Sequence, residues 1–278
     1  MVPMIFEKEK VLSSQELYGF IGTVENDRNN KMSKVREFLY EFTVRTMDIV
    51  FSLLILVIAV PILLLIALLI KLDSPGPVIF RHRRVGYNRR KISKNSTEEN
   101  EQRIKESFGK PFILYKFRTM YADARERFPE LYEYDYSKEE LQSLPIKVLV
   151  ATKSEKAAKA ANESKSNDPR LTRIGRWLRR TSLDELPNFI NVLKGDMHLV
   201  GPRPDIHENI KYYTKRELRI FDVKPGITGL AQIEGRGMLS FHEINERDLE
   251  YVENRSFLLD IKILFKTLIV CLRGEGAY

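Results

Sequence analysis

The longest apolar stretch of the chain runs from Ile49 to Ile70, 22 residues with no charge and a single hydroxyl at Ser52. At about 1.5 Å of rise per residue, a helix of this length crosses a hydrocarbon core about 30 Å thick. A helix inside a soluble domain rarely stays apolar on every face for so long. The stretch therefore predicts a helix that resides in a membrane. It begins too late and is too long for the apolar region of a cleaved signal peptide.

Pro61 lies just past the middle of this stretch, where it removes a backbone donor and predicts a kink. Seven Lys or Arg residues precede the stretch between positions 1 and 48, and seven more follow it between 71 and 91. Basic residues mark the cytoplasmic side of a membrane, so this balance favours neither end. It predicts a bent helix that enters and leaves by the same leaflet. A single-pass anchor with a basic segment on each side is the alternative.

Helical periodicity recurs in three shorter regions. Apolar residues at helical spacing over 34–48 predict an amphipathic helix that leads into the membrane segment, and residues 240–251 predict a second helix. Residues 256–272 are strongly apolar but include two lysines, an aspartate and a threonine. That composition favours an amphipathic helix at the membrane interface over a spanning helix.

Extended segments are few and short. The two prolines in Ser74–Pro77 end the membrane helix, residues 77–81 are expected to be extended, and residues 112–120 begin as a β-rich run. Pro225–Gly229 predicts a tight turn. The pattern as a whole indicates an α/β fold that is mostly helical, with a small sheet.

The same pattern divides the chain into three parts. Residues 1–44 are expected to form an N-terminal lead-in and amphipathic helix, residues 45–73 the membrane helix, and residues 74–278 one compact domain. Two polar regions within that domain, at about 88–110 and 121–166, have the character of insertions.

Charge and cysteine content narrow the class of partner. The 278-residue chain has a net charge of +8 and a pI near 9.4, which indicates an anionic partner such as lipid headgroups, a nucleotide-linked substrate or nucleic acid. Its one cysteine, Cys271, excludes an intrachain disulfide and fits a reducing compartment. The four histidines lack ligand spacing, so a zinc site is not expected.

An acid pair, Asp184 and Glu185, lies in the most basic region of the chain. Ser182 and Glu185 have the spacing of a capping box, or Asp184 is itself the N-cap; in both cases a helix begins here and its dipole keeps a carboxylate ionised. An ionised carboxylate suits a nucleophile or a ligand of Mg²⁺. The alternative is that Asp184 is only a helix cap.

Basic side chains around the acid pair are candidates for phosphate binding. Arg203 stands between Pro202 and Pro204, which limits the freedom of its backbone and lowers the cost of ordering its guanidinium. Bidentate guanidinium groups suit phosphate oxygens. The other candidates are a set of arginines that share one helix face and two basic residues of the KFRTM segment: Arg173, Arg176, Arg180, Lys116 and Arg118. A solvated basic face or a contact with lipid headgroups is the alternative for the helix.

Taken together, these segments resemble the bacterial sugar transferases that begin glycan assembly on a polyprenyl carrier, the monotopic phosphoglycosyl transferases or undecaprenyl-phosphate sugar phosphotransferases. The resemblance covers most of residues 45–278. Besides the proline-containing apolar helix, the matching segments are 72–86, 116–120, 167–204, 224–236 and 251–267.

The resemblance implies a re-entrant membrane helix and a small α/β domain on the cytoplasmic face of a bacterial inner membrane. It implies Mg²⁺ dependence and transfer of a sugar 1-phosphate from a UDP-sugar to polyprenyl phosphate, with release of UMP. Asp184 matches the family's nucleophile, which forms a covalent aspartyl phospho-sugar, and Glu185 matches its acidic partner and second metal ligand. Arg203 matches the arginine of a phosphate-binding Pro-Arg-Pro element. The implied partners are the UDP-sugar, polyprenyl phosphate and membrane lipids.

The chain departs from the family pattern in places. Val60 precedes Pro61 where the family often has serine, and Asn188 follows the DELP segment where glutamine is usual. The long N-terminal transmembrane domain of larger family members is not expected. The resemblance leaves open the sugar, the glycan pathway and whether the chain forms a homo-oligomer.

Two other functions fit parts of the sequence. The positive charge also fits a membrane-tethered nucleic-acid-binding protein, but no nucleic-acid-binding motif is present, so nucleic acid is not an expected partner. An inactive relative that recruits assembly partners through its insertions is the second alternative. The intact Asp184–Glu185 pair favours the enzyme over this scaffold.

Overall fold

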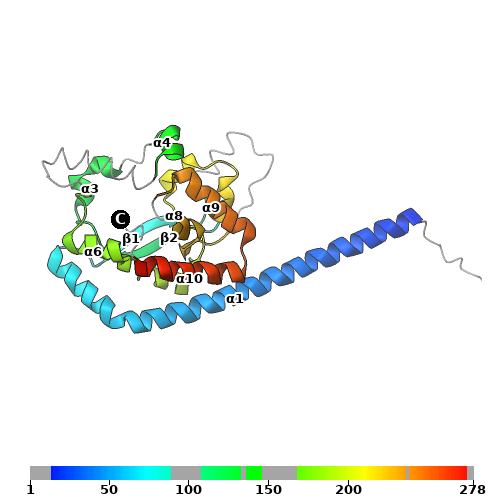
Figure 1. The fold of residues 1–278 in the computed structure, drawn as a ribbon, viewed down its shortest axis with the longest axis horizontal. Coiled ribbons are helices and arrows are strands. Elements are labelled where there is room, and N and C mark those ends of the chain that lie inside the picture. The colour runs from blue at the N-terminus through cyan, green and yellow to red at the C-terminus, as the bar shows by residue number, and fades with distance from the viewer. Residues whose placement is uncertain (1–13, 89–107, 133–135, 146–167, 236–237, 274–278) are drawn as a thin grey trace, which may run out of the picture. The chain divides into compact units, whose positions relative to one another are not determined.

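The computed structural model of this chain describes residues 14–88, 108–132, 136–145, 168–235 and 238–273 (Figure 1). The chain divides into two compact units, Met1–Val44 and Arg45–Tyr278. The helices are α1 (Ser14–Asp73), α3 (Ala124–Arg127), α4 (Lys138–Ser143), α6 (Arg173–Thr181), α7 (Asn188–Lys194), α8 (Leu230–Gly235), α9 (Phe241–Asn254) and α10 (Phe257–Arg273), with short 3₁₀ helices η1 (Pro129–Tyr132), η2 (Leu183–Glu185), η3 (His207–Tyr212) and η4 (Glu217–Asp222).

Two pairs of strands complete the fold of the described residues. Strands β1 (Ile79–Val85) and β2 (Pro111–Phe117) are antiparallel, with Ile79 opposite Phe117 and Val85 opposite Pro111. Strands β3 (His198–Val200) and β4 (Gly226–Thr228) are parallel. The prediction of a mostly helical chain with little sheet is therefore confirmed, as are helices over 240–251 and 256–272.

Two local predictions are wrong. Pro225–Gly229 does not form a tight turn, because Gly226–Thr228 pairs with the strand that precedes Gly201. The pairing depends on close backbone approach: a Cβ at Gly226 would lie 2.1 Å from the Gly201 nitrogen. Single-sequence turn signals do not detect a strand of three residues whose partner lies about 30 positions away in sequence.

The second error concerns the helix start at the acid pair. Ser182 is the C-cap of α6, with a left-handed φ of 58°, and its side chain caps nothing. Asp184 and Glu185 form the 3₁₀ turn η2, and α7 begins only at Asn188 without a side-chain cap. An N-cap residue needs extended backbone. The left-handed Ser182 therefore cannot form the predicted capping box, and Asp184 is not the N-cap.

In the first unit, α1 is already helical at Ser14, so the lead-in is helical where the structure describes it. Phe38 and Phe42 stack one turn apart, with ring centroids separated by 6.4 Å. Both rings are exposed, as are Val35 and Leu39 on the same stretch.

In the second unit, α1 continues through the predicted membrane segment. Pro61 lies inside the helix, which ends at Asp73, as the prolines that follow it predict. Within this unit the ribbon of α1 changes direction (Figure 1). Most of its apolar side chains are exposed, among them Ile58 and Leu64. In the described part of the chain, one helix, Lys34–Asp73, is long and apolar enough to cross a membrane.

Both ends of the membrane segment are fixed to the rest of the second unit. At its start, Arg45 donates to the carbonyls of Val192 and Leu193 at 2.5 and 2.7 Å. Asp48 accepts from the Leu199 backbone N–H at 2.9 Å and pairs with the His198 ring at 2.5 Å. These contacts join the start of the segment to the end of α7 and to β3.

At the other end, Ile66 and Ile70 pack against Phe117 and Leu178 in one apolar cluster. Asp73 accepts the backbone N–H of Ile174 at 2.9 Å. The last turn of α1 and the first turn of α6 are therefore joined by both packing and a hydrogen bond.

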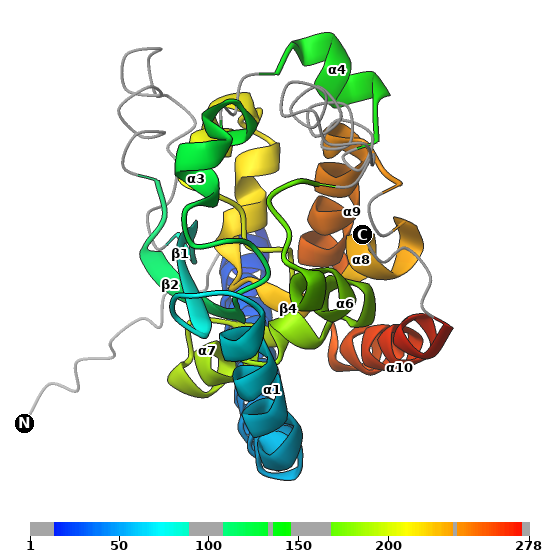
Figure 2. The same ribbon diagram turned by 90° about the vertical axis from the view of Figure 1, so that its left-hand side faces the viewer.

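Two larger apolar clusters hold the remaining elements together. One joins Phe112 and Leu114 of β2 to Val192 of α7, Leu199 of β3 and Ile263 of α10. In Figure 2 the hairpin and α7 lie to the left, α8, α9 and α10 to the right, and α6 between them. The cluster places β2, α7 and β3 against each other beside α10.

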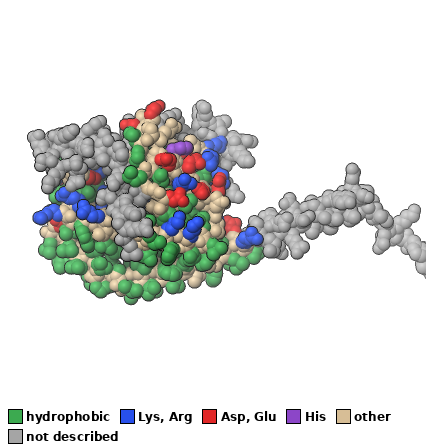
Figure 3. All heavy atoms as spheres, in the orientation of Figure 1, with side chains coloured by type: hydrophobic (Ala, Val, Ile, Leu, Met, Phe, Trp, Pro, Cys, Tyr) green, Lys and Arg blue, Asp and Glu red, His purple; other side chains and the backbone are tan. Residues whose placement is uncertain are grey.

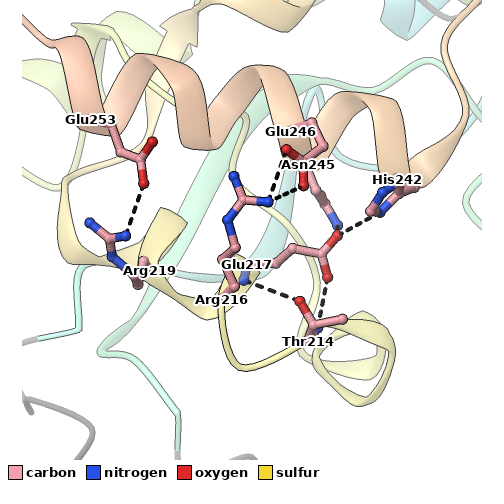
Figure 4. A network of polar contacts seen from close by, with 8 residues as sticks. All are labelled: Thr214, Arg216, Glu217, Arg219, His242, Asn245, Glu246 and Glu253. Atoms are coloured by element: carbon pink, nitrogen blue, oxygen red, sulfur yellow. Dashed lines mark hydrogen bonds and ion pairs between the residues drawn. The ribbon is translucent and has the colours of Figure 1, made fainter. Parts of the chain in front are cut away.

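The second cluster mixes aliphatic and aromatic side chains, several of them from η3, η4 and α9. Buried Glu217 fastens η4 to α9 by accepting from His242 at 3.1 Å and Asn245 at 3.2 Å, while it also accepts the Thr214 N–H (Figure 4). Two exposed arginine–glutamate pairs, both 2.9 Å, flank it: Arg216–Glu246 and Arg219–Glu253. Exposed pairs of this kind each contribute only about 0–1 kcal/mol, so Glu217 is the main polar attachment.

Candidate active site

Strand β2 brings the first charged group to the site. Side chains alternate along a strand, so Lys116 lies on the same face of β2 as Phe112 and Leu114, two buried members of the apolar cluster. Its side chain is 17% exposed. The Lys116 ammonium pairs with Glu185 Oε1 at 2.6 Å.

Asn191 fixes the acid pair relative to this strand. Fully buried on α7, it accepts the Tyr115 backbone N–H at 3.0 Å and donates to the Ile113 carbonyl at 2.7 Å. The side-chain amide thus bonds to the free edge of β2 as a neighbouring strand would. This contact sets the position of α7 and, through it, of the turn that holds Glu185.

The loop after β3 supplies the third group. Arg203 Nη2 lies 3.5 Å from Glu185 Oε1, and about half of the Arg203 side chain is exposed. The Gly226 N–H donates to the Pro202 carbonyl at 2.8 Å, and Arg84 donates to the Pro204 carbonyl at 3.3 Å. The backbone on both sides of Arg203 is therefore held, while its guanidinium faces the acid pair.

Asp184 is buried, with 8% of its surface exposed. Burial raises the pKa of its carboxyl, Lys116 opposes this most strongly, Glu185 adds to the rise, and Arg179 and Arg203 oppose it. The expectation that the dipole of an α-helix keeps Asp184 ionised is wrong, since only the single 3₁₀ turn η2 begins there and α7 starts at Asn188. Cationic side chains are what favour the carboxylate at this position. Burial also lowers the pKa of Lys116, against the attraction of Glu185.

These groups surround a cavity of about 310 Å³. That volume lies at the lower end of the range of about 300–1,000 Å³ for small-molecule sites. The charged groups Lys116, Arg179, Asp184, Glu185 and Arg203 lie together on its lining. The rest of the lining is largely apolar and comes from β4, α7, α8, α9 and α10: Leu186, Phe189, Ile227, Ala231, Ile233, Ile244 and Val270, with Ser182, Thr228, Gln232 and Thr267.

The structure brings together four of the predicted site residues: Lys116, Asp184, Glu185 and Arg203. Four other predicted phosphate-binding residues, Arg118, Arg173, Arg176 and Arg180, do not line this cavity in the described part of the chain. The three helical arginines are exposed on α6, as expected for one shared helix face.

Arg118 has a structural role in this arrangement. It is buried and donates to the carbonyls of Ser74 and Pro75 and to the Ser74 hydroxyl. The last carbonyls of a helix have no partner within it. Arg118 satisfies backbone carbonyls at the end of α1, so its guanidinium is not directed to the cavity.

Two polar residues on the cavity lining, Arg179 and Gln232, were not among the residues predicted from the sequence. Arg179 lines the cavity because it lies off the face shared by the other helical arginines, and it donates to the Thr119 hydroxyl at 3.1 Å. Gln232 on α8 also lines it. Helical spacing could have separated Arg179 from the exposed face; no sequence signal distinguished Gln232.

The carboxylates at the site suit a magnesium ion that also coordinates the phosphate oxygens of a ligand. Among the described residues no group of three or more His, Cys, Asp or Glu could hold a metal ion. Mg²⁺ is commonly bound by one or two carboxylates together with phosphate oxygens, and Asp184 and Glu185 provide such carboxylates. The nearby cations disfavour Mg²⁺ in the absence of an anionic substrate.

Asp248 holds the loop of Arg203 by a backbone hydrogen bond. It is buried on α9 and accepts the backbone N–H of Arg203, and burial raises the pKa of its carboxyl to about 8. Between about pH 4 and pH 8 the folded protein keeps a proton that the unfolded chain has lost, so stability falls as pH rises through this window, by up to about 1.4 kcal/mol per pH unit from this group.

Replacing Asp248 with asparagine is therefore expected to reduce the loss of thermal stability between pH 6 and pH 8, while retaining an acceptor for the Arg203 N–H. Thermal unfolding of both proteins at the two pH values measures this. An equal loss in the variant and the wild type would contradict the assigned ionisation.

Among known protein families, the profile of the family described as bacterial sugar transferase matches residues 39–274 of this chain. That range includes most of the second unit and every residue of the cavity.

Several curated proteins are similar in sequence. An undecaprenyl-phosphate galactose phosphotransferase of Salmonella typhimurium is 39% identical over 251 residues, 90% of this chain and 44% of that protein. A UDP-glucose:undecaprenyl-phosphate glucose-1-phosphate transferase of Escherichia coli is 38% identical, over 84% of this chain and 41% of that protein. The uncharacterized sugar transferase EpsL of Bacillus subtilis is 37% identical, over 84% of this chain and 88% of that protein. The chain thus spans less than half the length of the first two and most of the third.

Proposed function

Because the chain belongs to the bacterial sugar transferase family, we propose that it transfers a sugar 1-phosphate from a UDP-sugar to polyprenyl phosphate and releases UMP. The observation that carries this proposal is the buried Asp184 carboxylate on a cavity wall that also includes Lys116, Arg179 and Arg203. Relatives whose names specify undecaprenyl phosphate and galactose or glucose support the same acceptor and donor classes.

The reaction joins two anions, so a nucleophilic carboxylate helps by dividing it into two transfers. In the first, an Asp184 oxygen attacks the β-phosphorus of the UDP-sugar, the bond from that phosphorus to the bridging oxygen breaks, and UMP leaves. In the second, an oxygen of polyprenyl phosphate attacks the same phosphorus and the bond to Asp184 breaks. The products are a polyprenyl diphosphosugar and a free carboxylate.

The cationic side chains around Asp184 favour the ionised form of the proposed nucleophile. Lys116 opposes the effect of burial on Asp184 and so favours the ionised nucleophile. Arg203, held by its proline-flanked backbone, and Arg179 are positioned to bind phosphoryl oxygens as charge builds on them. Glu185 pairs with both Lys116 and Arg203, which orders the two cations before substrate arrives.

Magnesium, held by Asp184 and Glu185 together with phosphate oxygens, would supply Lewis-acid stabilisation of the diphosphate. Lys116, Arg179 and Arg203 contribute charge stabilisation of their own at the same cavity.

The surface of the second unit supports residence at a membrane. Apolar side chains gather along the lower edge in Figure 3, over α1 and α10. On α10 the exposed fractions reach 81% for Leu258 and 65% for Phe265. Exposed apolar surface of this extent marks an interaction site. Because Thr267 and Val270 of the same helix line the cavity, α10 joins the apolar surface to the site, as a lipid-linked acceptor requires.

The contacts of α1 support a re-entrant path on the cytoplasmic face of a bacterial inner membrane. Asp48 near the start of the segment and Asp73 at its end both bond to the same compact unit. A straight crossing would carry one end away from that unit by about 1.5 Å per residue.

Cysteine labelling tests this topology. In a Cys271→Ser background, which removes the native cysteine, Lys34→Cys and Lys71→Cys place one thiol before the membrane segment and one after it. A membrane-impermeant maleimide is expected to label both sites in inside-out vesicles and neither in intact spheroplasts. Labelling of one site in spheroplasts and of the other in inverted vesicles would establish a single-pass anchor instead.

The activity itself is tested by UMP release from UDP-glucose, UDP-galactose and other UDP-sugars with polyprenyl phosphate, using the detergent-solubilised full chain. Release of UMP beyond one equivalent per chain is expected to depend on the lipid acceptor, and all UMP release is expected to depend on an intact Asp184. Release by no member of a broad UDP-sugar panel would contradict the proposal and favour the inactive scaffold.

A further inference from the structure

Gln232 is a polar side chain on the cavity wall whose bonding capacity the proposed chemistry does not use. Its side-chain amide oxygen and nitrogen are both buried, and neither has a hydrogen-bond partner among the described residues. An amide left unpaired in this way destabilises the folded protein, because its donor and acceptor have lost water without gaining partners. Gln232 lines the cavity, so a change of its side-chain rotamer would bring the amide to a ligand bound there, which can supply the missing partners.

Neighbouring groups do not satisfy the amide. The nearby hydroxyl pair on the lining, Thr228 and Thr267, lies 2.6 Å apart. Thr267 donates its proton to the Ile263 carbonyl at 2.8 Å, so Thr228 is the donor of the pair. Both hydroxyl protons are therefore committed. A Cβ at Gly229 would lie 2.8 Å from Gln232 Oε1, so the bare glycine leaves the room in which the amide sits.

The surrounding wall limits what the amide recognises. Close to Gln232 in sequence, Ala231 and Ile233 line the cavity, as do Ile227, Ile244 and Val270. The hydroxyl groups of a sugar placed here would lose water without gaining partners, at a cost similar to that of the unpaired amide. A prenyl chain would fit the apolar wall but would leave the amide unsatisfied.

A planar pyrimidine base meets both requirements. Its faces are apolar enough for the aliphatic wall, and the imide edge of uracil presents an N–H donor directly beside a carbonyl acceptor. A side-chain amide pairs with such an edge through two parallel hydrogen bonds, as the amides of Asn and Gln do with base edges in nucleic-acid-binding proteins. We propose that Gln232 recognises the uracil of the nucleotide substrate and sets the specificity for uridine over nucleotides that lack this edge.

This inference rests on the proposed function, because it assigns a role within the UDP-sugar site. Binding of free nucleotides to the full, detergent-solubilised chain tests it without catalysis. In the wild type, UMP is expected to bind about tenfold or more tightly than 3-methyl-UMP, since methylation removes the N–H and a good bidentate pair contributes about 1–3 kcal/mol of discrimination.

In Gln232→Met the effect of N3 methylation is expected to fall below about twofold. Gln232→Glu keeps the side chain's shape but lacks the amide donor. It is expected to weaken UMP binding at least as much as Gln232→Met does. It also provides a second measurement if the methionine variant does not fold. Gln142→Met is the matched control: Gln142 is exposed on α4, outside the cavity lining, and this variant is expected to match the wild type.

The outcomes separate this inference from the function on which it rests. An equal methylation effect in the wild type and the Gln232 variants would overturn the assignment and leave the transferase proposal intact. Weaker binding of UDP-glucose and UDP-galactose to the variants, with UMP binding unchanged, would assign Gln232 to the sugar and also overturn it. A wild type that binds neither UMP nor any UDP-sugar would contradict the proposed function itself.

Discussion

Replacing Asp184 with asparagine is expected to lower UMP release by at least about ten-thousandfold, the scale seen when a nucleophile is removed from an enzyme site. Asparagine has nearly the same shape but lacks the charged oxygen that is proposed to attack phosphorus. Radiolabel transfer and UMP release from a UDP-sugar and polyprenyl phosphate measure the effect. Asp222→Asn, an exposed aspartate outside the cavity, is the matched control and should retain wild-type turnover.

Loss of activity through unfolding can be distinguished from loss of chemistry in the same variant. Burial raises the pKa of Asp184, so the folded protein bears a cost for the ionised carboxyl that asparagine removes. The Asp184→Asn protein is therefore expected to unfold at the same temperature as the wild type or above it. Full turnover by this variant would reject Asp184 as the nucleophile.

The second large effect is expected from Lys116→Met, which should reduce turnover by roughly a hundredfold to a thousandfold, the usual cost of removing a charge-stabilising group. In the proposed mechanism the ionised form of Asp184 attacks, and Lys116 is the strongest influence lowering the pKa of Asp184. Without the ammonium, that pKa rises. The acidic limb of the pH–rate profile must then move to higher pH.

Single-turnover UMP release over a range of pH measures this shift, and Lys110→Met is the matched control because Lys110 is exposed just before β2. An acidic limb that stays in place in Lys116→Met, with only a weaker apparent affinity for the UDP-sugar, would limit Lys116 to phosphate binding. That result would contradict its proposed influence on the nucleophile.

The sequence was sufficient for the residues at the centre of the site. Asp184 and Glu185 were identified from their isolation among basic residues, and Arg203 from the prolines beside it. The structure places these groups on one cavity with Lys116, although Lys116 and Glu185 are 69 positions apart in sequence. These residues were predictable because adjacent carboxylates and nearby cationic side chains already indicate a site for an anionic ligand.

Residues whose role depends on tertiary contacts were not predictable in the same way. Arg118 is one position beyond β2 and meets the unsatisfied carbonyls at the end of α1, a contact that no local pattern records. Arg173, Arg176 and Arg180 share a face as their spacing predicts, but that face is exposed, whereas Arg179 beside it lines the cavity. Periodicity shows which side chains share one face of a helix. It does not show whether that face meets solvent or a binding cavity.

The ionisation of Asp184 illustrates the same limit. A predicted helix start gave a physical reason for a low pKa, but the chain forms a left-handed residue and a 3₁₀ turn there instead. Burial and the surrounding cations, which no short segment encodes, decide the pKa. Neighbouring cations, and not the predicted helix start, are thus what favours the ionised carboxylate at this position.

The most direct test of the account is to trap the covalent intermediate. The purified chain is incubated with UDP-glucose, UDP-galactose or the UDP-sugar found active in the panel, without polyprenyl phosphate, and its intact mass and peptides are measured. The account predicts a mass increase equal to one sugar phosphate, located on the peptide that contains Asp184, with one UMP released for each adduct. UMP release that requires the lipid acceptor, with no adduct on the protein at any stage, would show direct transfer between the substrates and contradict the central role of Asp184.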